Sequence, residues 1–193
     1  MHVQVTTAPA AQAVSDAEAV AHAKIDSDAA TADSALITDL VLTAIRWAER
    51  YCNRAFVTQT ITLDLEAAEL VDPFYVPNPP IIAISSFKLI DDDDAETTIT
   101  TSEYRVLGAD PARIEQKGDG WTVERTHKAA EIIYTAGYGA ASTVPEDIKT
   151  AVRIVFTDLY ENRQNAVASN LKNLMLAEKM LAPYRIGHLT QWT

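Results

Sequence analysis

Apolar residues recur at helical spacing in two parts of the chain, one on each side of a middle part with a different pattern. Residues 34–52 carry apolar side chains three and four positions apart, with polar and charged residues on the other side. After Pro145 the same spacing returns up to Leu159, and a polar break at about 162–170 precedes a further helix that ends near Leu181. The pattern therefore predicts helices in both the N-terminal and the C-terminal parts.

The middle part alternates between apolar and polar residues, which is typical of half-buried strands. Residues 57–65 show this period of two and are rich in β-branched side chains. Further short strand candidates are separated by Gly, Pro and Asp, and they are 74–76, 81–90, 97–100, 104–107, 112–116, 121–125 and 129–135. We expect these strands to form a meandering antiparallel sheet.

Local signals mark the start of the helical part. Ser15 and Glu18 have the spacing of a capping box, in which each residue bonds to the backbone amide of the other. The helix they begin ends at about Lys24, and the polar residues 25–33 are interpreted as a linker. Asp33 or Ser34 is placed to cap the long helix that follows.

The order of elements predicts an α+β fold, with a helical core from the N- and C-terminal helices and an inserted antiparallel β-meander. We expect a single domain over residues 15–182, with its β-rich insertion at about 56–135. Residues 1–14 have many small side chains and no periodicity, which favours a flexible arm. Residues 183–193 follow the end of the last predicted helix and are interpreted as a C-terminal tail.

Composition and charge narrow the classes of function. The 193 residues are 48% hydrophobic and 22% charged, as in folded soluble proteins, and the formal net charge is −11. Residues 64–103 hold ten acids against one base, so tight binding to phosphate backbones is disfavoured. Cys52 is the single cysteine, which excludes an internal disulfide and fits a reducing compartment. With no run of about 18 apolar residues, we expect no membrane partner.

Signatures of enzymes are absent or weak. The turn at 137–142 loosely resembles a dinucleotide-binding fingerprint, but Ser142 replaces the third small residue and Pro145 delays the helix, so a strand-exit turn is the favoured interpretation. The four histidines lie far apart without metal-ligand spacing. Asp91 to Asp94 lack the glycine and the alternating acids of a calcium loop, so a solvated hairpin tip is expected. The sequence predicts no catalysis, no cofactor and no metal.

Several segments together resemble one family, the head-to-tail connector (adaptor) proteins of tailed bacteriophages, which includes adaptors of gene transfer agents. They appear in the expected order over residues 15–185. They are RYCNRAFVTQT (50–60), PNPPI (77–81), YRV (104–106), GW (120–121), TAGYG (135–139), VPEDIK (144–149), YENR (160–163) and PYR (183–185), together with residues 18–26. Two positions depart from the pattern, since Ala95 follows the acidic run where the family commonly has Asp-Gly, and Thr122 stands where a proline is common.

The resemblance implies a non-enzymatic structural subunit. About twelve copies would form a homo-oligomeric ring beneath the portal protein and extend the DNA channel to a stopper or tail-side connector protein. Double-stranded DNA would pass without specific binding, and an acidic lining fits such a conduit because it repels phosphate. The protein would be made in the bacterial cytoplasm and sit in the neck of a virion or phage-like particle. The alternatives are a monomeric or small-oligomer binding module of a phage or host pathway, and an unrecognised enzyme.

Two sets of residues are candidate functional sites. The C-terminal tail carries large apolar and cationic side chains, a composition typical of segments that order on a partner. Its candidate portal-docking residues are Tyr184, Arg185, Ile186, Leu189 and Trp192. The alternative is that this tail packs back onto the helices of its own subunit. The acidic residues Asp91, Asp92, Asp93 and Asp94 are candidates for lining the DNA channel.

Overall fold

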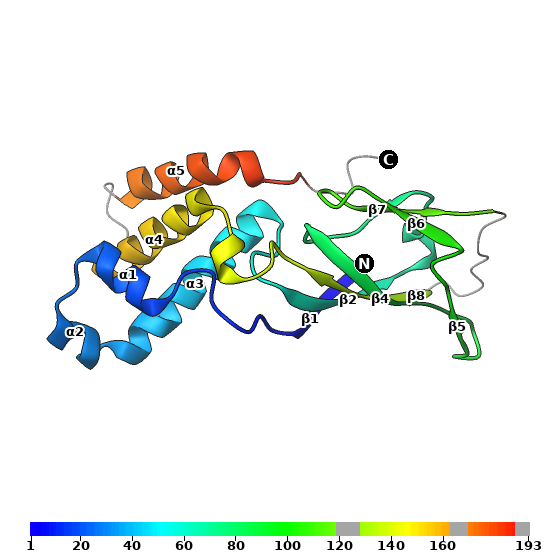
Figure 1. Ribbon diagram of the computed structural model, residues 1–193, viewed down its shortest axis with the longest axis horizontal. Helices are drawn as coiled ribbons and strands as arrows, with labels where there is room; N and C mark the ends of the chain where they lie inside the picture. Colours follow the sequence, from blue (N-terminus) through cyan, green and yellow to red (C-terminus); the bar gives the residue numbers. More distant parts are fainter. Residues whose placement is uncertain (119–127, 163–169, 188–193) are drawn as a thin grey trace. The chain divides into compact units, whose positions relative to one another are not determined.

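The computed structural model describes residues 1–118, 128–162 and 170–187, and the chain divides into two compact units (Figure 1). The β unit comprises Met1–Ala10 and Thr58–Tyr138. The helical unit comprises Ala11–Val57 and Gly139–Gly187. The backbone therefore enters and leaves each unit more than once along the sequence.

Within its described residues, the β unit contains two antiparallel sheets. The first has the strand order β1-β2-β8-β4-β5 and the second the order β3-β7-β6. The strands are β1 (His2–Thr7), β2 (Gln59–Leu65), β3 (Phe74–Tyr75), β4 (Ile81–Ile90), β5 (Glu96–Thr98), β6 (Tyr104–Leu107), β7 (Arg113–Gln116) and β8 (Ala130–Ala136), with a short 3₁₀ turn η1 (Ala67–Glu69). Strand β8 pairs with both β2 and β4, so the sheet is not a simple meander.

Alternation along the central strands produces the core of the β unit. Ile61 and Leu63 on β2, and Ile132 and Tyr134 on β8, are fully buried, while the residues between them are half-exposed. The Tyr134 hydroxyl donates to the Pro77 carbonyl oxygen at 2.9 Å, which satisfies this buried polar atom.

Aromatic contacts join the two sheets. Phe87 on β4 meets Phe74 on β3 edge-to-face, with ring centroids 6.3 Å apart. Phe87 also meets Tyr104 on β6, with centroids 5.7 Å apart. Such aromatic pairs add stabilisation beyond the apolar area that they bury, so one side chain of the first sheet links it to both outer strands of the second.

Strand β1 differs from the flexible arm expected for residues 1–14. It pairs antiparallel with β2, placing His2 opposite Asp64 and Val5 opposite Ile61. The Thr6 and Thr62 hydroxyls lie 2.6 Å apart. Almost all of β1 is exposed, so its order comes from backbone pairing at a sheet edge rather than from burial. This is why hydrophobic periodicity did not indicate it.

The helical unit contains α1 (Asp16–Ala23), α2 (Ser27–Ala32), α3 (Ser34–Cys52), η2 (Ala141–Thr143), α4 (Glu146–Glu161), α5 (Asn170–Leu181) and η3 (Ala182–Tyr184). Helix α4 packs against α1, α3 and α5. The α3 stripe from Ile37 to Cys52 and the α4 stripe from Ile148 to Phe156 supply most of its core. The short α2, expected to be a linker, buries none of its residues, which explains why it has no periodic signal.

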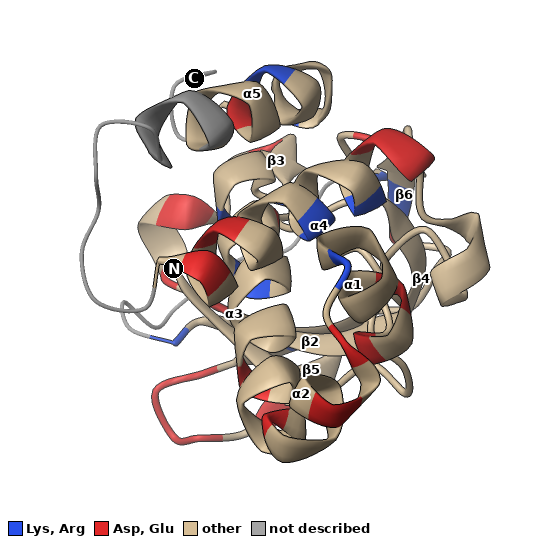
Figure 2. Cartoon of the chain, turned by 90° about the vertical axis from the view of Figure 1, so that its left-hand side faces the viewer, with Lys and Arg blue, Asp and Glu red and all other residues tan. Residues whose placement is uncertain are grey.

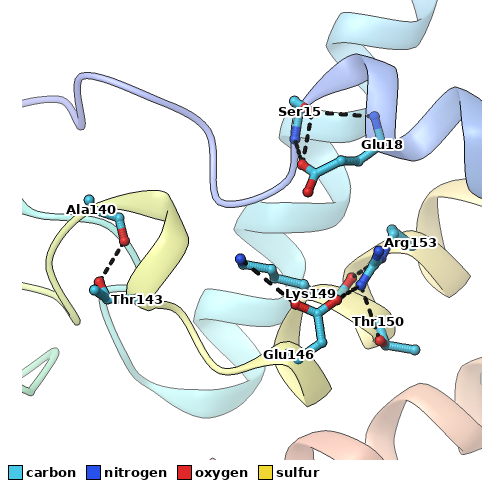
Figure 3. A network of polar contacts seen from close by, with 8 residues as sticks. All are labelled: Ser15, Glu18, Ala140, Thr143, Glu146, Lys149, Thr150 and Arg153. Atoms are coloured by element: carbon cyan, nitrogen blue, oxygen red, sulfur yellow. Dashed lines mark hydrogen bonds and ion pairs between the residues drawn. The ribbon is translucent and has the colours of Figure 1, made fainter.

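Polar contacts fix the ends of α1 and α4 (Figure 3). The Ser15 backbone amide donates to the Glu18 carboxylate at 2.7 Å, and the Glu18 amide donates to the Ser15 hydroxyl at 3.3 Å, which confirms the predicted capping box. In the first half of α4, Arg153 forms an ion pair with Glu146. Asp33, expected as a possible cap of α3, makes no side-chain capping bond and instead accepts from the Tyr160 hydroxyl at 2.9 Å.

The predicted α+β class is confirmed, because N- and C-terminal helices pack together and antiparallel sheets are inserted between them in the sequence. Most predicted strands match within two residues. The strand expected at 121–125 lies outside the described residues.

Candidate functional site

The C-terminal end of α3 and the segment after α5 form the most densely bonded surface that involves predicted site residues. Helix α3 ends at Asn53, which adopts the left-handed conformation with φ of 54°. The Asn53 amide donates to the Arg50 carbonyl and the Arg54 amide to the Glu49 carbonyl, which satisfies two of the last carbonyl groups of the helix. The Cys52 carbonyl remains available for a partner from elsewhere in the chain.

That partner is the segment after α5, which lies against the end of α3. The Ile186 amide donates to the Cys52 carbonyl oxygen at 3.0 Å. In return, the Asn53 side-chain amide donates to the Ile186 carbonyl oxygen at 2.7 Å. The buried Arg54 guanidinium donates to the Tyr184 carbonyl oxygen. These three bonds fix residues 184–186, which we call the C-terminal anchor.

Side chains of the anchor add further contacts. The Arg185 guanidinium lies 5.1 Å from the centre of the Tyr51 ring, in cation–π geometry. Tyr51 stacks on Trp47, with centroids 5.6 Å apart. The Tyr184 hydroxyl donates to the Asp147 carboxylate at 3.3 Å, and burial, with this carboxylate, raises the pKa of Tyr184.

The anchor changes the interpretation of the tail. Tyr184, Arg185 and Ile186, proposed from the sequence as portal-docking residues, contact their own subunit instead of standing free. The tail thus packs back at residues 184–186, as in the alternative, and the docking role of these residues stays a prediction. Leu189 and Trp192 lie outside the described residues. The sequence contains a local signal for the end of α3, because Asn53 lies at the position where αL caps occur, but this signal does not indicate the contact with residues 184–186.

Burial shifts the pKa of two ionisable groups near this surface. Burial raises the pKa of the Glu49 carboxyl, although its Oε1 accepts from the Phe56 amide at 2.9 Å, which opposes the shift. Burial raises the pKa of the Cys52 thiol to about 11, so the thiolate is scarce at neutral pH. Cys52 is fully buried and packs as a small hydrophobic residue.

The acidic run occupies the turn between β4 and β5 (Figure 1). Asp92, Asp93 and Asp94 are exposed, which confirms the expected solvated hairpin tip. Asp91 differs because its Oδ1 accepts from the Asp93 amide at 3.0 Å and from the Ala95 amide at 2.8 Å. Asp94 takes the left-handed conformation with φ of 61°. The glycine of an Asp-Gly turn adopts this conformation more readily.

The glycine-containing turn after β8 serves the backbone. Gly137 and Gly139 have φ values of 127° and 116°. A Cβ on Gly139 would lie 2.9 Å from the Thr143 hydroxyl oxygen. Both glycines are thus required by local conformation, in agreement with the strand-exit turn.

No candidate for a metal or cofactor site emerges from the part of the chain that the structure describes. No group of three or more His, Cys, Asp or Glu side chains there could hold a metal ion. A depression of about 240 Å³ in the β unit is lined by acidic and basic side chains. They include Asp64 and Lys128, whose Oδ1 and Nζ atoms lie 3.6 Å apart. Among the described helices, none is long and apolar enough to cross a bilayer.

The chain is similar over nearly its whole length to chains in gene transfer agent (GTA) particles. Compared with one from the neck of an empty GTA particle computed with C6 symmetry, the TM-score is 0.81. It is 0.80 for a chain from the virion of a native GTA particle and 0.77 for one from the neck of a native particle computed with C12 symmetry. In each case the identity is 25% and the match covers 97% of both chains.

No protein-family model and no curated protein sequence matches the chain. The structural similarity covers both units. It agrees with the resemblance found in the sequence in that both point to proteins of the neck of a phage-like particle.

Proposed function

We propose that the chain is a structural subunit of the neck of a phage-like particle, where it acts as the adaptor ring beneath the portal. The full-length similarity to chains in GTA necks carries this proposal. Cyclic symmetry in those necks supports a ring of identical subunits, and about twelve copies is the number that the C12 neck suggests. The ring would link the head to a stopper or tail-side connector protein.

Removal of the gene tests this function directly. Without the adaptor, filled heads should accumulate without tails, since the link between portal and tail is missing. Purified heads that carry portals should then bind the added chain, measured by co-sedimentation and by imaging of the neck. Normal tailed particles from the deletion strain would contradict the proposal and favour a binding module outside the particle.

Residues 184–186 and the later residues of the C-terminal tail are proposed to have different roles. We propose that the C-terminal anchor holds the tail on the helical unit, and that Leu189 and Trp192 contact the portal. Support comes from the contacts of residues 184–186, which leave the two later apolar residues as the remaining candidates. Replacing both Leu189 and Trp192 with serine should abolish binding to portal-bearing heads without changing the unfolding midpoint. Retained binding would remove the docking role.

The acidic hairpin tip is proposed to face the DNA path. Exposure of Asp92 to Asp94 and the net charge of the surrounding segment support this, because an acidic lining repels phosphate. Replacing Asp92, Asp93 and Asp94 with asparagine should leave assembly intact and slow the release of DNA. If DNA retention and release match the natural particle at both low and high salt, the channel-lining role is wrong.

A further inference from the structure

Helix α3 carries a second, half-exposed apolar stripe beside its buried one. Leu36, Leu40 and Trp47 lie on the flank of the helix next to the exposed Thr43, and all three remain partly exposed to solvent. Stacking against Tyr51 holds the Trp47 ring in place. Leu36, Leu40, Thr43 and Trp47 are called the α3 patch. Tryptophan is among the residues that most often dominate the binding energy of an interface, and here its ring is already ordered.

Helix α5 presents a complementary surface. Met175 and Leu176 are 53% and 51% exposed, although the same helix buries Ala177 and Leu181 on its other side. Lys179 is exposed one turn after Met175. Met175, Leu176 and Lys179 are called the α5 patch. Two adjacent large apolar side chains left in water favour burial against a partner, and methionine adapts to irregular surfaces such as an indole ring.

The two patches belong to different helices of the helical unit. Helix α4 packs against both α3 and α5, and Figures 1 and 2 both show it between them. The residues of both patches are exposed or half-exposed to solvent. A contact between two different patches of identical subunits propagates head to tail and gives a ring where the rotation between copies closes, whereas a patch that pairs with itself gives a two-fold dimer.

Exposed charged residues favour one orientation of α5 on the α3 patch of the next copy. Asp39 and Arg46 are exposed on α3, Asp39 toward the N-terminal half and Arg46 toward the C-terminal half. If α5 of a second copy lay antiparallel to α3 with its patch over Leu40 and Trp47, Lys179 would come near Asp39. A parallel arrangement would bring Lys179 near Arg46, where like charges repel.

We propose that the α5 patch of one copy docks antiparallel on the α3 patch of the next copy, and that this contact forms the subunit interface of the ring. The inference rests on the proposed neck function, since it is the ring that supplies the second copy. It also predicts a polarity, because every subunit uses α3 toward one neighbour and α5 toward the other.

Cysteine cross-linking in assembled particles tests the contact. Chains that carry Thr43→Cys and Leu176→Cys together replace the natural chain, and purified particles are treated with a short bis-maleimide. The native Cys52 is buried and its thiol is protonated at neutral pH, so unmodified particles serve as the background. The double variant should give a ladder of dimers and higher multimers. Each single variant should stay monomeric on a denaturing gel.

The outcomes separate the inference from the function on which it rests. Dimers from Thr43→Cys alone would mean that α3 pairs with α3, which overturns the head-to-tail contact. A chain that is present in the neck but gives no ladder would place the ring interface elsewhere, so the inference would fail while the neck function stands. Tailed particles that lack the chain altogether would remove the neck function itself.

A charge exchange tests the orientation. Asp39→Lys and Lys179→Asp should each weaken incorporation into particles several-fold, and the double variant should restore most of it, because exposed ion pairs contribute modestly. Asp28→Lys is the matched control, an exposed acid on α2 that belongs to neither patch, and it should have no effect. Single variants that assemble normally, or a double variant without rescue, would contradict the antiparallel arrangement.

Discussion

The C-terminal anchor and the β4–β5 turn are both short connecting segments at the ends of regular elements, yet they are held in different ways. Residues 184–186 are held by Asn53, Arg54 and the Cys52 carbonyl, which lie more than a hundred positions earlier in the sequence. The β4–β5 turn is held by bonds from Asp91 to its own neighbours. A segment held by long-range bonds contributes to the stability of the whole unit. A segment held by local bonds can change with little effect on the stability of the rest of the fold.

Among the tests of this comparison, truncation of the C-terminal tail should have the largest effect on stability. Deletion of residues 183–193 removes three hydrogen bonds to the end of α3 and the Arg185–Tyr51 contact, so we expect a loss of about 2–4 kcal/mol in the free energy of unfolding. Urea unfolding followed by circular dichroism measures this. Deletion of residues 188–193 keeps every anchor contact and serves as the control. Equal midpoints for both truncations would show that the anchor adds nothing to stability.

Arg54→Ala tests the anchor at one residue. The variant removes a buried guanidinium and the donor to the Tyr184 carbonyl oxygen, with an expected loss of about 1–3 kcal/mol. Arg50→Ala changes an exposed residue in the last turn of α3 and should change stability by less than about 0.5 kcal/mol. If the two variants unfold at the same urea concentration, Arg54 does not hold the tail.

In the β4–β5 turn, only the first acid should matter for folding. Asp91→Ala removes the acceptor of two backbone amides and should cost about 1 kcal/mol. Asp92→Ala removes an exposed carboxylate and should leave the unfolding midpoint unchanged or slightly raised, since neighbouring acids repel. Thermal and urea unfolding of both variants give the comparison, and a larger loss from Asp92→Ala would reverse the assignment.

The smallest expected effect is a pH dependence near the anchor. Because burial raises the pKa of Glu49 in the folded state, that state binds its proton more tightly than the unfolded chain does. Lowering the pH toward the ordinary glutamate value of about 4.3 should therefore stabilise the natural chain relative to Glu49→Gln, which keeps an acceptor for the Phe56 amide.

Glu18→Gln is the control with the opposite sign. Bonds from the Ser15 amide and hydroxyl lower the pKa of Glu18, so its stabilisation is present above the ordinary value and is lost as the pH falls below it. Unfolding midpoints of the three proteins between about pH 3 and 7 show whether the slopes differ in sign. A natural chain that loses stability relative to Glu49→Gln as the pH falls would contradict the burial argument.

The parts of the structure that could be predicted from the sequence are those whose signals are local. The helical period over residues 34–52, the alternation over 57–65 and the Ser15–Glu18 box each correspond to an observed element. Strand β1 and helix α2 were missed because they bury almost nothing, so no hydrophobic pattern indicates them.

The candidate site was only partly predictable for a related reason. The solvated acidic turn follows from charge repulsion between neighbours in the sequence. The anchor depends on Asn53 and Arg54 meeting residues 184–186, and no local pattern encodes a contact over such a separation. The half-exposed stripe of α3 is visible in the sequence, but it cannot be distinguished from the buried stripe until the packing of α4 is known.

The way in which the two units share the chain has a consequence for how the protein folds. Strand β8 (Ala130–Ala136) is the central partner of β2 and β4, and α4 (Glu146–Glu161) is the central partner of α1 and α3. During synthesis, the early strands and helices must therefore wait for partners made much later, and contacts of such long sequence separation slow folding. Exposed strand edges and apolar helix stripes persist during that interval, and such surfaces are prone to aggregate.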